Sequence, residues 1–285
     1  MFKNFARTQI HKLMTASLRA TNKQRGESDL KRQLYEIVPD ISAQYTAATI
    51  SPDDIYMTEK VRCLHAFQTK LALDALELAK KKLGRKRFNV VDIGDSSGTH
   101  LSYLSQLTKP LDIEIEAISI NLDPVAVEKV RQRGIRAELC RAEELHERPD
   151  GVRADLFLMY ETLEHLTDPI GFMRMMALKA SCTYFVISVP YVTQSRLGLG
   201  YIRRNWKTDA LAENTHVFEL SPADWNLLFR FSGWRIVESN LYCQYPKKRL
   251  LSPTKYVWRR LDYDGFYGVI LEQDLSVSNQ YKSWN

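Results

Sequence analysis

The stretch VVDIGDSSGTHL, residues 90–101, decides the fold of this chain. It begins with apolar residues typical of a buried strand and continues into a loop of small and polar residues. Glycines at positions 94 and 98 permit tight turns and a close approach of backbone amides to a ligand, whereas Ser96 stands where a third glycine is expected. The stretch therefore predicts a strand followed by a cofactor-binding loop.

Strands and helices alternate along the chain after this point. Apolar runs predict strands at 88–93, 113–120, 135–140, 154–160 and 183–190, with helical segments between them. Two final strands, at 234–243 and 265–274, are expected to form an antiparallel edge. This alternation predicts an α/β fold, a doubly wound, mostly parallel sheet of seven strands with helices on both faces.

The chain is expected to have two parts. Residues 1–87 are predicted to form a helical extension, in which Ser51 and Pro52 begin a long helix that ends at Gly84. Residues 88–285 are predicted to form the catalytic domain. Within it, residues 191–220 lack strong periodicity and are predicted to form an insertion that covers the site. The cysteines form no CxxC pair, and the sequence shows neither an apolar signal segment nor a long apolar run. These features favour a cytoplasmic protein.

The positive charge is concentrated in an N-terminal arm, residues 1–25. The chain holds 40 Lys and Arg against 34 Asp and Glu, and the arm holds basic residues but no acid. Apolar residues lie among these charges at helical spacing. Two interpretations remain: a helix that packs on the body with a solvated basic face, or a surface for anionic membrane, nucleic acid or an acidic partner.

The loop chemistry excludes two cofactor classes. A dinucleotide loop needs GxGxxG, which GDSSGTH does not match, and Asp95 would repel a pyrophosphate. A phosphate-binding P-loop needs GK[ST], which is absent here. A positively charged cofactor fits the acid better.

Two segments carry a resemblance to a known family. VVDIGDSSG resembles the first motif of class I S-adenosylmethionine-dependent methyltransferases, and ADLFLMYETLEHLTDP, residues 154–169, resembles their fourth-strand motif. The resemblance implies S-adenosylmethionine as cofactor. The implied cofactor-binding residues are Asp92, Gly94, Asp95, Ser96, Gly98, Asn121, Ala142, Glu143 and Tyr160.

Three positions depart from the family pattern. Ser96 replaces the middle glycine, Asn121 stands where an acid takes the ribose hydroxyls, and Arg141 stands where an acid often lies near adenine. Asparagine offers one neutral oxygen in place of a bidentate carboxylate. These departures leave open a non-catalytic, methyltransferase-like binding protein.

Two histidines are the candidate catalytic residues. His165 follows the fourth strand, and His216 follows Glu213 near the end of the insertion, where a histidine beside an acid suits general base catalysis. Each histidine also has a structural interpretation. His165 could instead orient the loop, and His216 could instead be a surface residue. No metal-binding set is evident, so none is expected.

The acceptor is constrained more loosely. The sequence after the fourth strand lacks (D/N/S)PP(Y/F), and no cysteine follows a proline, which argues against base-directed DNA enzymes. Segments such as ENTHVFELSPADW resemble bacterial methyltransferases of surface polysaccharides, which implies a sugar hydroxyl in a glycan or related small molecule. The arm would then dock at the inner membrane. An RNA- or protein-directed enzyme is the alternative, although no RNA-binding module is recognisable.

Overall fold

A computed structural model of the chain describes residues 2–46, 48–147, 152–198, 215–247, 250–261 and 263–280. The helices are α1 (Phe2–Gln24), α2 (Ser28–Ile37), α3 (Ile55–Leu83), α4 (Thr99–Leu107), α5 (Pro124–Gln132), α6 (Pro169–Lys179), α8 (Pro222–Ser232) and α9 (Lys255–Leu261). The strands are β1 (Arg87–Ile93), β2 (Glu114–Asn121), β3 (Arg136–Leu139), β4 (Val152–Arg153), β5 (Leu156–Tyr160), β6 (Ala180–Ser181), β7 (Tyr184–Tyr191), β8 (Arg196–Leu197), β9 (Phe218–Glu219), β10 (Trp234–Cys243) and β11 (Gly265–Gln273). Short 3-10 turns include η2 (Ala142–Glu147), η3 (Leu163–His165) and η5 (Ser252–Thr254).

A seven-stranded sheet with the order β10-β11-β7-β5-β1-β2-β3 forms the centre of the molecule. The pairs from β7 to β3 are parallel, and β11 is antiparallel to both β7 and β10. The order reverses at β1, which has β2 on one side and β5 on the other. The predicted doubly wound, mostly parallel sheet is confirmed, as is the antiparallel edge.

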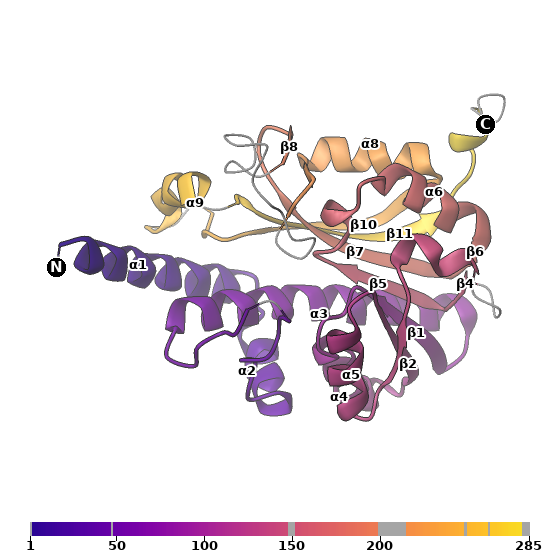
Figure 1. Cartoon of the computed structure of the whole chain (residues 1–285), viewed down its shortest axis with the longest axis horizontal. Coiled ribbons are helices and arrows are strands. Elements are labelled where there is room, and N and C mark those ends of the chain that lie inside the picture. Colours follow the sequence, from indigo (N-terminus) through magenta and orange to yellow (C-terminus); the bar gives the residue numbers. More distant parts are fainter. Residues whose placement is uncertain are drawn as a thin grey trace.

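Helices cover both faces of the sheet. In Figure 1, α6 and α8 lie above it, whereas α3, α4 and α5 lie below. All residues of β5 and β7 are buried, because strands covered on both faces need apolar side chains on both. Ligands bind such sheets at the carboxyl ends of the strands, next to the point where the order reverses.

Short capping sequences set the helix starts. Asp123, Asp168 and Ser221 each precede a proline and accept a hydrogen bond from a backbone amide of the first turn, as predicted. The expected start at Ser51 is wrong. The side chain of Asp54 caps α3 by accepting from the amide of Met57, so the helix begins at Ile55.

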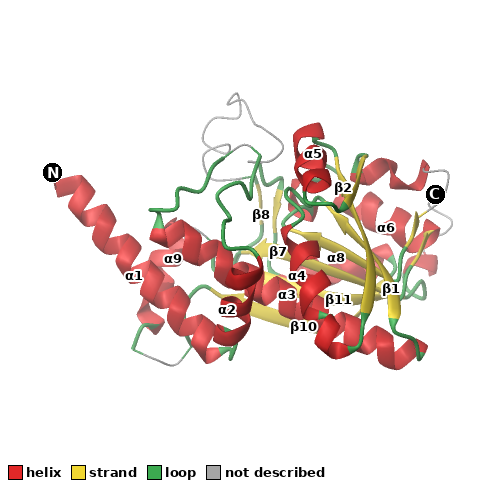
Figure 2. Cartoon of the chain, turned by 90° about the horizontal axis from the view of Figure 1, so that it is seen from below, coloured by secondary structure: helices red, strands yellow, loops and turns green. Residues whose placement is uncertain are grey.

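The N-terminal helices are built into the molecule. One face of α3 packs on β5, β7 and β11, and α1 packs along α3, with α9 beside α1 in both views (Figures 1 and 2). The buried Ser17 hydroxyl of α1 donates to the carbonyl of Gln244 over 2.9 Å and receives a bond from the indole of Trp258. The division of the chain at residue 87 stays a proposal, because α3 forms one of the helical layers.

Among the described residues, no helix combines the length and the apolar character that crossing a bilayer requires.

Candidate active site

The loop after β1 has the shape of a ligand-binding turn. Gly94 and Gly98 take positive φ angles of 88° and 71°. Asp95 folds the loop back, because its Oδ1 accepts hydrogen bonds from the amides of Ser97 at 3.1 Å and Gly98 at 2.7 Å. Helix α4 begins directly after Gly98.

Gly94 lies against the segment that follows β5. A β-carbon at this position would lie 2.3 Å from Oγ1 of Thr162 and 2.7 Å from its methyl group. No side chain fits in that space. The cofactor loop and the residues after β5 therefore form one continuous surface.

A buried carboxylate gives this loop its charge preference. Asp92, at the end of β1, is 2% exposed, and no hydrogen bond from any described residue reaches its Oδ2. Burial raises the pKa of Asp92 well above its usual value, and the nearby Asp95 raises it further. A cationic ligand group beside Asp92 would compensate for this burial. The residues present thus fit the ammonium and sulfonium groups of S-adenosylmethionine.

Asn121 lies at the expected strand end, but its side chain is already engaged. Its Nδ2 donates to the carbonyl of Asp95 over 3.0 Å, and its Oδ1 accepts from the amide of Asp123 over 2.8 Å. The neutral amide thus ties the end of β2 to the cofactor loop. An aspartate could not make the first of these bonds, because a carboxylate does not donate.

Ala142 and Glu143 begin the turn η2 after β3, next to this edge. The backbone amide of Cys140 donates to the carbonyl of Asn121, which places η2 beside the end of β2. Glu143 Oε1 lies 3.4 Å from the guanidinium of Arg141. Arg141 therefore pairs with Glu143, one of the predicted cofactor-binding residues.

Ser96 and Ser97 bind a segment that the sequence did not connect to this loop. The Ser96 hydroxyl donates to the carbonyl of Gln44 over 2.6 Å, and the Ser97 hydroxyl donates to the side-chain oxygen of Gln44 over 3.1 Å. Lys129 of α5 holds the same segment through the carbonyls of Ala43 and Tyr45. The segment between α2 and α3 thus covers the cofactor loop.

The side chain of Tyr160 is bound to helix α3. Its hydroxyl donates to the backbone carbonyl of Gln68 in α3 over 3.1 Å, and its ring contacts that of His100. His100 in turn bonds the side chain of Gln68 over 2.9 Å. The structure therefore places Tyr160 in a buried polar network between β5 and α3.

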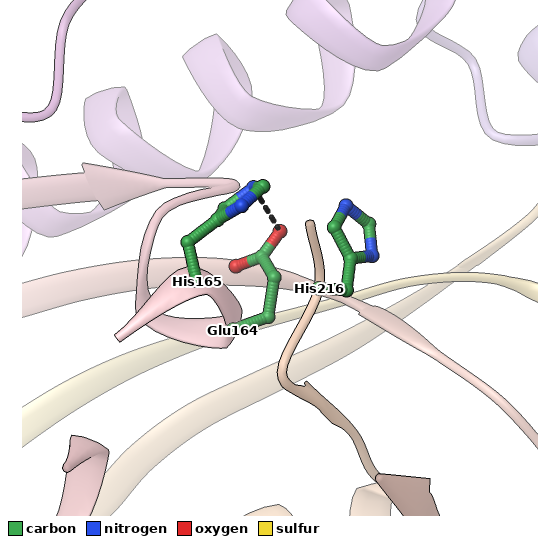
Figure 3. Close-up of side chains that lie close together, drawn as sticks. All are labelled: Glu164, His165 and His216. Carbon is green, nitrogen blue, oxygen red and sulfur yellow. Dashed lines mark ion pairs between the residues drawn. The ribbon is translucent and has the colours of Figure 1, made fainter. Parts of the chain in front are cut away.

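The two predicted catalytic histidines meet after β5. Figure 3 shows Glu164 and His165 on one turn and His216 on a separate segment, with the three side chains directed toward one another. The two imidazole rings lie 4.7 Å apart in an edge-on arrangement. The amide of Val217 donates to the carbonyl of Glu164 over 2.8 Å and joins the two segments.

Two acids at this position were not singled out by the sequence. Glu161, which has a positive φ of 49°, accepts a hydrogen bond from Ser188 over 2.9 Å. Burial raises the pKa of Glu161 to about 8 and that of Glu164 well above its usual value. A strained backbone and two raised carboxyl pKa values at one strand end are typical of a catalytic site.

Part of the predicted insertion, 199–214, lies outside the described residues, and Glu213 with it. Within the described part, β8 and β9 form a small antiparallel pair. Arg196 of β8 pairs with the buried carboxylate of Glu219 in β9. Among the described residues, the acid beside His216 is Glu219, whose Oε1 lies 3.5 Å from Nδ1 of the histidine.

The fold, the cofactor loop and the acidic strand end define a class I S-adenosylmethionine-dependent methyltransferase. A family model described as a methyltransferase domain matches residues 63–239, more than half of the chain, and the chain belongs to this family. S-adenosylmethionine is its cofactor. No curated protein gives a significant match to the chain.

Solved structures share the fold at low sequence identity. An O-methyltransferase from the trans-AT polyketide synthase multienzyme of Brevibacillus brevis, in complex with S-adenosylhomocysteine, is 12% identical with a TM-score of 0.52, and the match covers 82% of each chain. A candidate sarcosine dimethylglycine methyltransferase from Galdieria sulphuraria is 13% identical with a TM-score of 0.52, and the match covers 88% of this chain and 98% of that one. These likenesses bear on the fold and leave the acceptor open.

Proposed function

We propose that this methyltransferase transfers the methyl group to a hydroxyl of a sugar, in a bacterial glycan or a related small molecule. The observation that carries the proposal is the cluster of Glu164, His165 and His216 directly after Thr162, which contacts the cofactor loop at Gly94. An acceptor that lies against this cluster stands at the edge of the cofactor site.

The cluster suits an oxygen acceptor. A hydroxyl is a weak nucleophile and has to lose its proton as the methyl group arrives, so the site needs groups that activate it. S-adenosylmethionine supplies the electrophilic methyl group when bound. His165 and His216 are the proposed catalytic residues, which activate the hydroxyl, and the carboxyl groups of Glu164 and Glu219 lie beside them.

The alternative of an RNA acceptor has less support from the charge distribution. The basic run at residues 80–87 is largely paired with acids of the same molecule. The pairs are Lys80 and Lys86 with Asp112, Lys82 with Glu272, Arg85 with Asp155, and Arg87 with Glu116. Neutralised side chains contribute little to the phosphate attraction on which RNA binding depends.

The test is to identify the methylated atom. The purified protein is incubated with methyl-labelled S-adenosylmethionine and, separately, with glycan, RNA and protein acceptors, and each product is mapped by mass spectrometry and NMR. We expect an O-methyl sugar. Labelled RNA or protein with inert glycans would overturn the proposal.

A histidine variant tests the role of the cluster. His216→Ala is expected to lower turnover by about 100-fold or more, the usual effect of losing an activating group, with unchanged cofactor affinity. His146→Ala is the matched control, because His146 lies in η2 and bonds the carbonyl of Glu143. Wild-type turnover in His216→Ala would remove that residue from the mechanism.

We also propose that the enzyme acts in the cytoplasm and touches the inner membrane through α1. The exposed residues in the first half of α1 include the basic Arg7 and Lys12 and the apolar Ile10 and Leu13, which are 38% and 39% exposed. A basic helix with exposed apolar residues favours binding to anionic lipid.

Vesicle sedimentation checks the membrane contact. Arg7→Glu/Lys12→Glu is expected to lose binding to phosphatidylglycerol vesicles, while Lys81→Glu/Lys109→Glu, an equal charge change elsewhere on the exposed surface, keeps it. Equal loss in both variants would show only a net-charge effect.

A further inference from the structure

We propose that Glu164, His165 and His216 together bind one divalent transition-metal ion. One donor atom from each residue lies within 4.8 Å of the others. A tetrahedral ion with bonds of about 2.0–2.2 Å holds its donors about 3.3–3.6 Å apart, so the three donors have to approach one another by up to about 1.5 Å when the ion binds. No metal set was expected from the sequence, because the ligands come from two segments far apart in the chain.

The carboxylate of Glu164 is the first argument. Its side chain is fully buried, and none of the described residues donates a hydrogen bond to either of its oxygens. Its Oε1 lies 3.8 Å from Nε2 of His165, too far for a hydrogen bond but suited to two ligands of one ion. Buried charges are normally paired or bound to metal, and a metal ion would supply the charge that Glu164 needs.

The orientation of His165 is the second argument. Its Nδ1 lies 2.9 Å from the backbone carbonyl of Thr215, an acceptor that fixes a proton on Nδ1. The other ring nitrogen, Nε2, is the one that faces Glu164. A histidine that ligates metal through one nitrogen commonly donates from the other to a carbonyl or carboxylate.

His216 repeats this arrangement. Its Nδ1 lies 3.0 Å from the hydroxyl of Tyr263 and 3.5 Å from Oε1 of Glu219. Glu219 is fully buried, and Arg196 holds its other oxygen. The phenol thus holds the ring at Nδ1, with the carboxylate nearby, which leaves Nε2 as the atom that ligates. Both histidines therefore have outer partners of the kind found around metal sites.

The donor set indicates the kind of ion. Two imidazole nitrogens and one carboxylate favour ions such as Zn²⁺ or Mn²⁺ over Mg²⁺ and Ca²⁺, which prefer ligand sets made of oxygen. Three protein ligands also leave coordination positions for water or substrate, as in catalytic sites.

The role of the ion rests on the proposed function. A hydroxyl of the acceptor bound at an open position would become more acidic and would release its proton to water. The oxygen then forms a bond to the methyl carbon while the bond from that carbon to sulfur breaks, which leaves S-adenosylhomocysteine. The two histidines would act as ligands of the ion and would not take the proton themselves.

Metal binding is measured first, in an assay that does not depend on catalytic activity. The full-length protein is treated with a chelator and dialysed, and Mn²⁺ is titrated with detection by electron paramagnetic resonance, followed by displacement with Zn²⁺. We expect one site for each chain. Glu164→Gln and His165→Asn should each lower the affinity for Mn²⁺ by at least about 10- to 100-fold. His146→Asn, a histidine of η2 outside the cluster, is the control and should bind as the wild type does.

Circular dichroism separates loss of ligand from loss of fold, and two variants on different side chains guard against one that does not fold. Unchanged affinity in folded variants, or no binding of Mn²⁺ or Zn²⁺ at about millimolar concentration, overturns the inference. Metal binding without any methylated glycan would leave the metal site standing and contradict the proposed function. Glycan methylation by a protein that binds no metal would do the reverse.

Discussion

The hydroxyl of Ser96 donates a 2.6 Å hydrogen bond to the backbone carbonyl of Gln44, across 52 positions of the chain. The residue that breaks the glycine pattern of the cofactor loop is therefore the one that attaches the segment between α2 and α3. A glycine at 96 could not make this bond. The departure from the family motif is accompanied by a new contact that covers the loop.

Removing this hydroxyl should loosen the covering segment. Ser96→Ala is expected to lower the free energy of unfolding by about 1 kcal/mol, the usual value of one hydrogen bond, and to speed amide exchange at residues 41–46. Ser105→Ala, which loses a bond on the exposed face of α4, should leave that exchange unchanged. Hydrogen-exchange mass spectrometry provides the measurement, and unaltered exchange at 41–46 in Ser96→Ala would contradict the role.

A side chain at Gly94 should disrupt cofactor binding. Gly94→Ala places a β-carbon 2.3 Å from Oγ1 of Thr162 at a positive φ, so loop and strand end have to separate. Calorimetry should show at least a tenfold loss of affinity for S-adenosylmethionine, equivalent to about 1.4 kcal/mol. Gly134→Ala has a similar φ but open space around it, and should keep cofactor affinity. Equal affinities for S-adenosylmethionine in both variants would show that Gly94 is not part of the cofactor site.

Tyr263 should act as a positioning residue for His216. Tyr263→Phe removes the hydroxyl 3.0 Å from Nδ1 and is expected to lower kcat by about 10- to 100-fold, with cofactor affinity unchanged. The affinity for Mn²⁺ should fall in parallel, which a purely structural role would not cause. Tyr256→Phe, on an exposed ring of α9, is the control. Full activity in Tyr263→Phe would show that the ring of His216 is held by other contacts.

The buried histidines His65 and His100 should make the folded protein less stable at acidic pH. Burial lowers the pKa of His100 from 6.5 to about 3, and burial followed by the charge of His100 lowers the pKa of His65 well below its usual value. Below pH 6.5 the unfolded chain binds protons that the folded chain does not. This contribution to stability is therefore complete above pH 6.5 and is lost as the pH falls toward 3.

Urea unfolding across this pH range measures the effect. His100→Gln should show a shallower decline of the unfolding free energy than the wild type as the pH is lowered from 6.5. His146→Gln should decline as steeply as the wild type. Parallel curves for His100→Gln and the wild type would mean that His100 does not contribute to the acid sensitivity.

The inner face of α1 should be essential for stability. Leu18 is fully buried, and Leu18→Ala is expected to cost about 2–5 kcal/mol. Leu13→Ala, on the outward face, should cost little, since Leu13 is 39% exposed. Denaturant unfolding compares the two. Equal and small effects would support the view of residues 1–25 as a detachable arm.

Much of the fold was predictable because its signals are local. The alternation of apolar runs with capped helices predicts the seven strands, and the DxG motif at the end of β1 predicts a cofactor loop. The start of α3 was placed wrongly, because Ser51 with Pro52 and Asp54 are both good capping sequences and only packing selects between them. Tyr160 stays a predicted cofactor residue, and the contact of its ring with His100 could not be predicted from the sequence.

The site was only partly predictable, because its contacts are distant in sequence. His165 and His216 were each recognised, yet their convergence depends on a bond from His165 to Thr215, 50 positions away. The contact between Ser96 and Gln44 could not be predicted from a motif, because Ser96 bonds a backbone carbonyl, which every residue has. In the sequence, Glu164 is only one residue of the fourth-strand motif. Its burial without a hydrogen bond to its carboxylate is what indicates a metal ligand.

The position of β11 has a consequence for how the protein is made. This strand, residues 265–273, lies between β7 and β10, so both of these strands lack a neighbour until it is inserted. During synthesis the ribosome releases it after every other strand. The edge of β7, which ends at Tyr191, therefore stays unpaired until residues 265–273 have been synthesised and have left the exit tunnel.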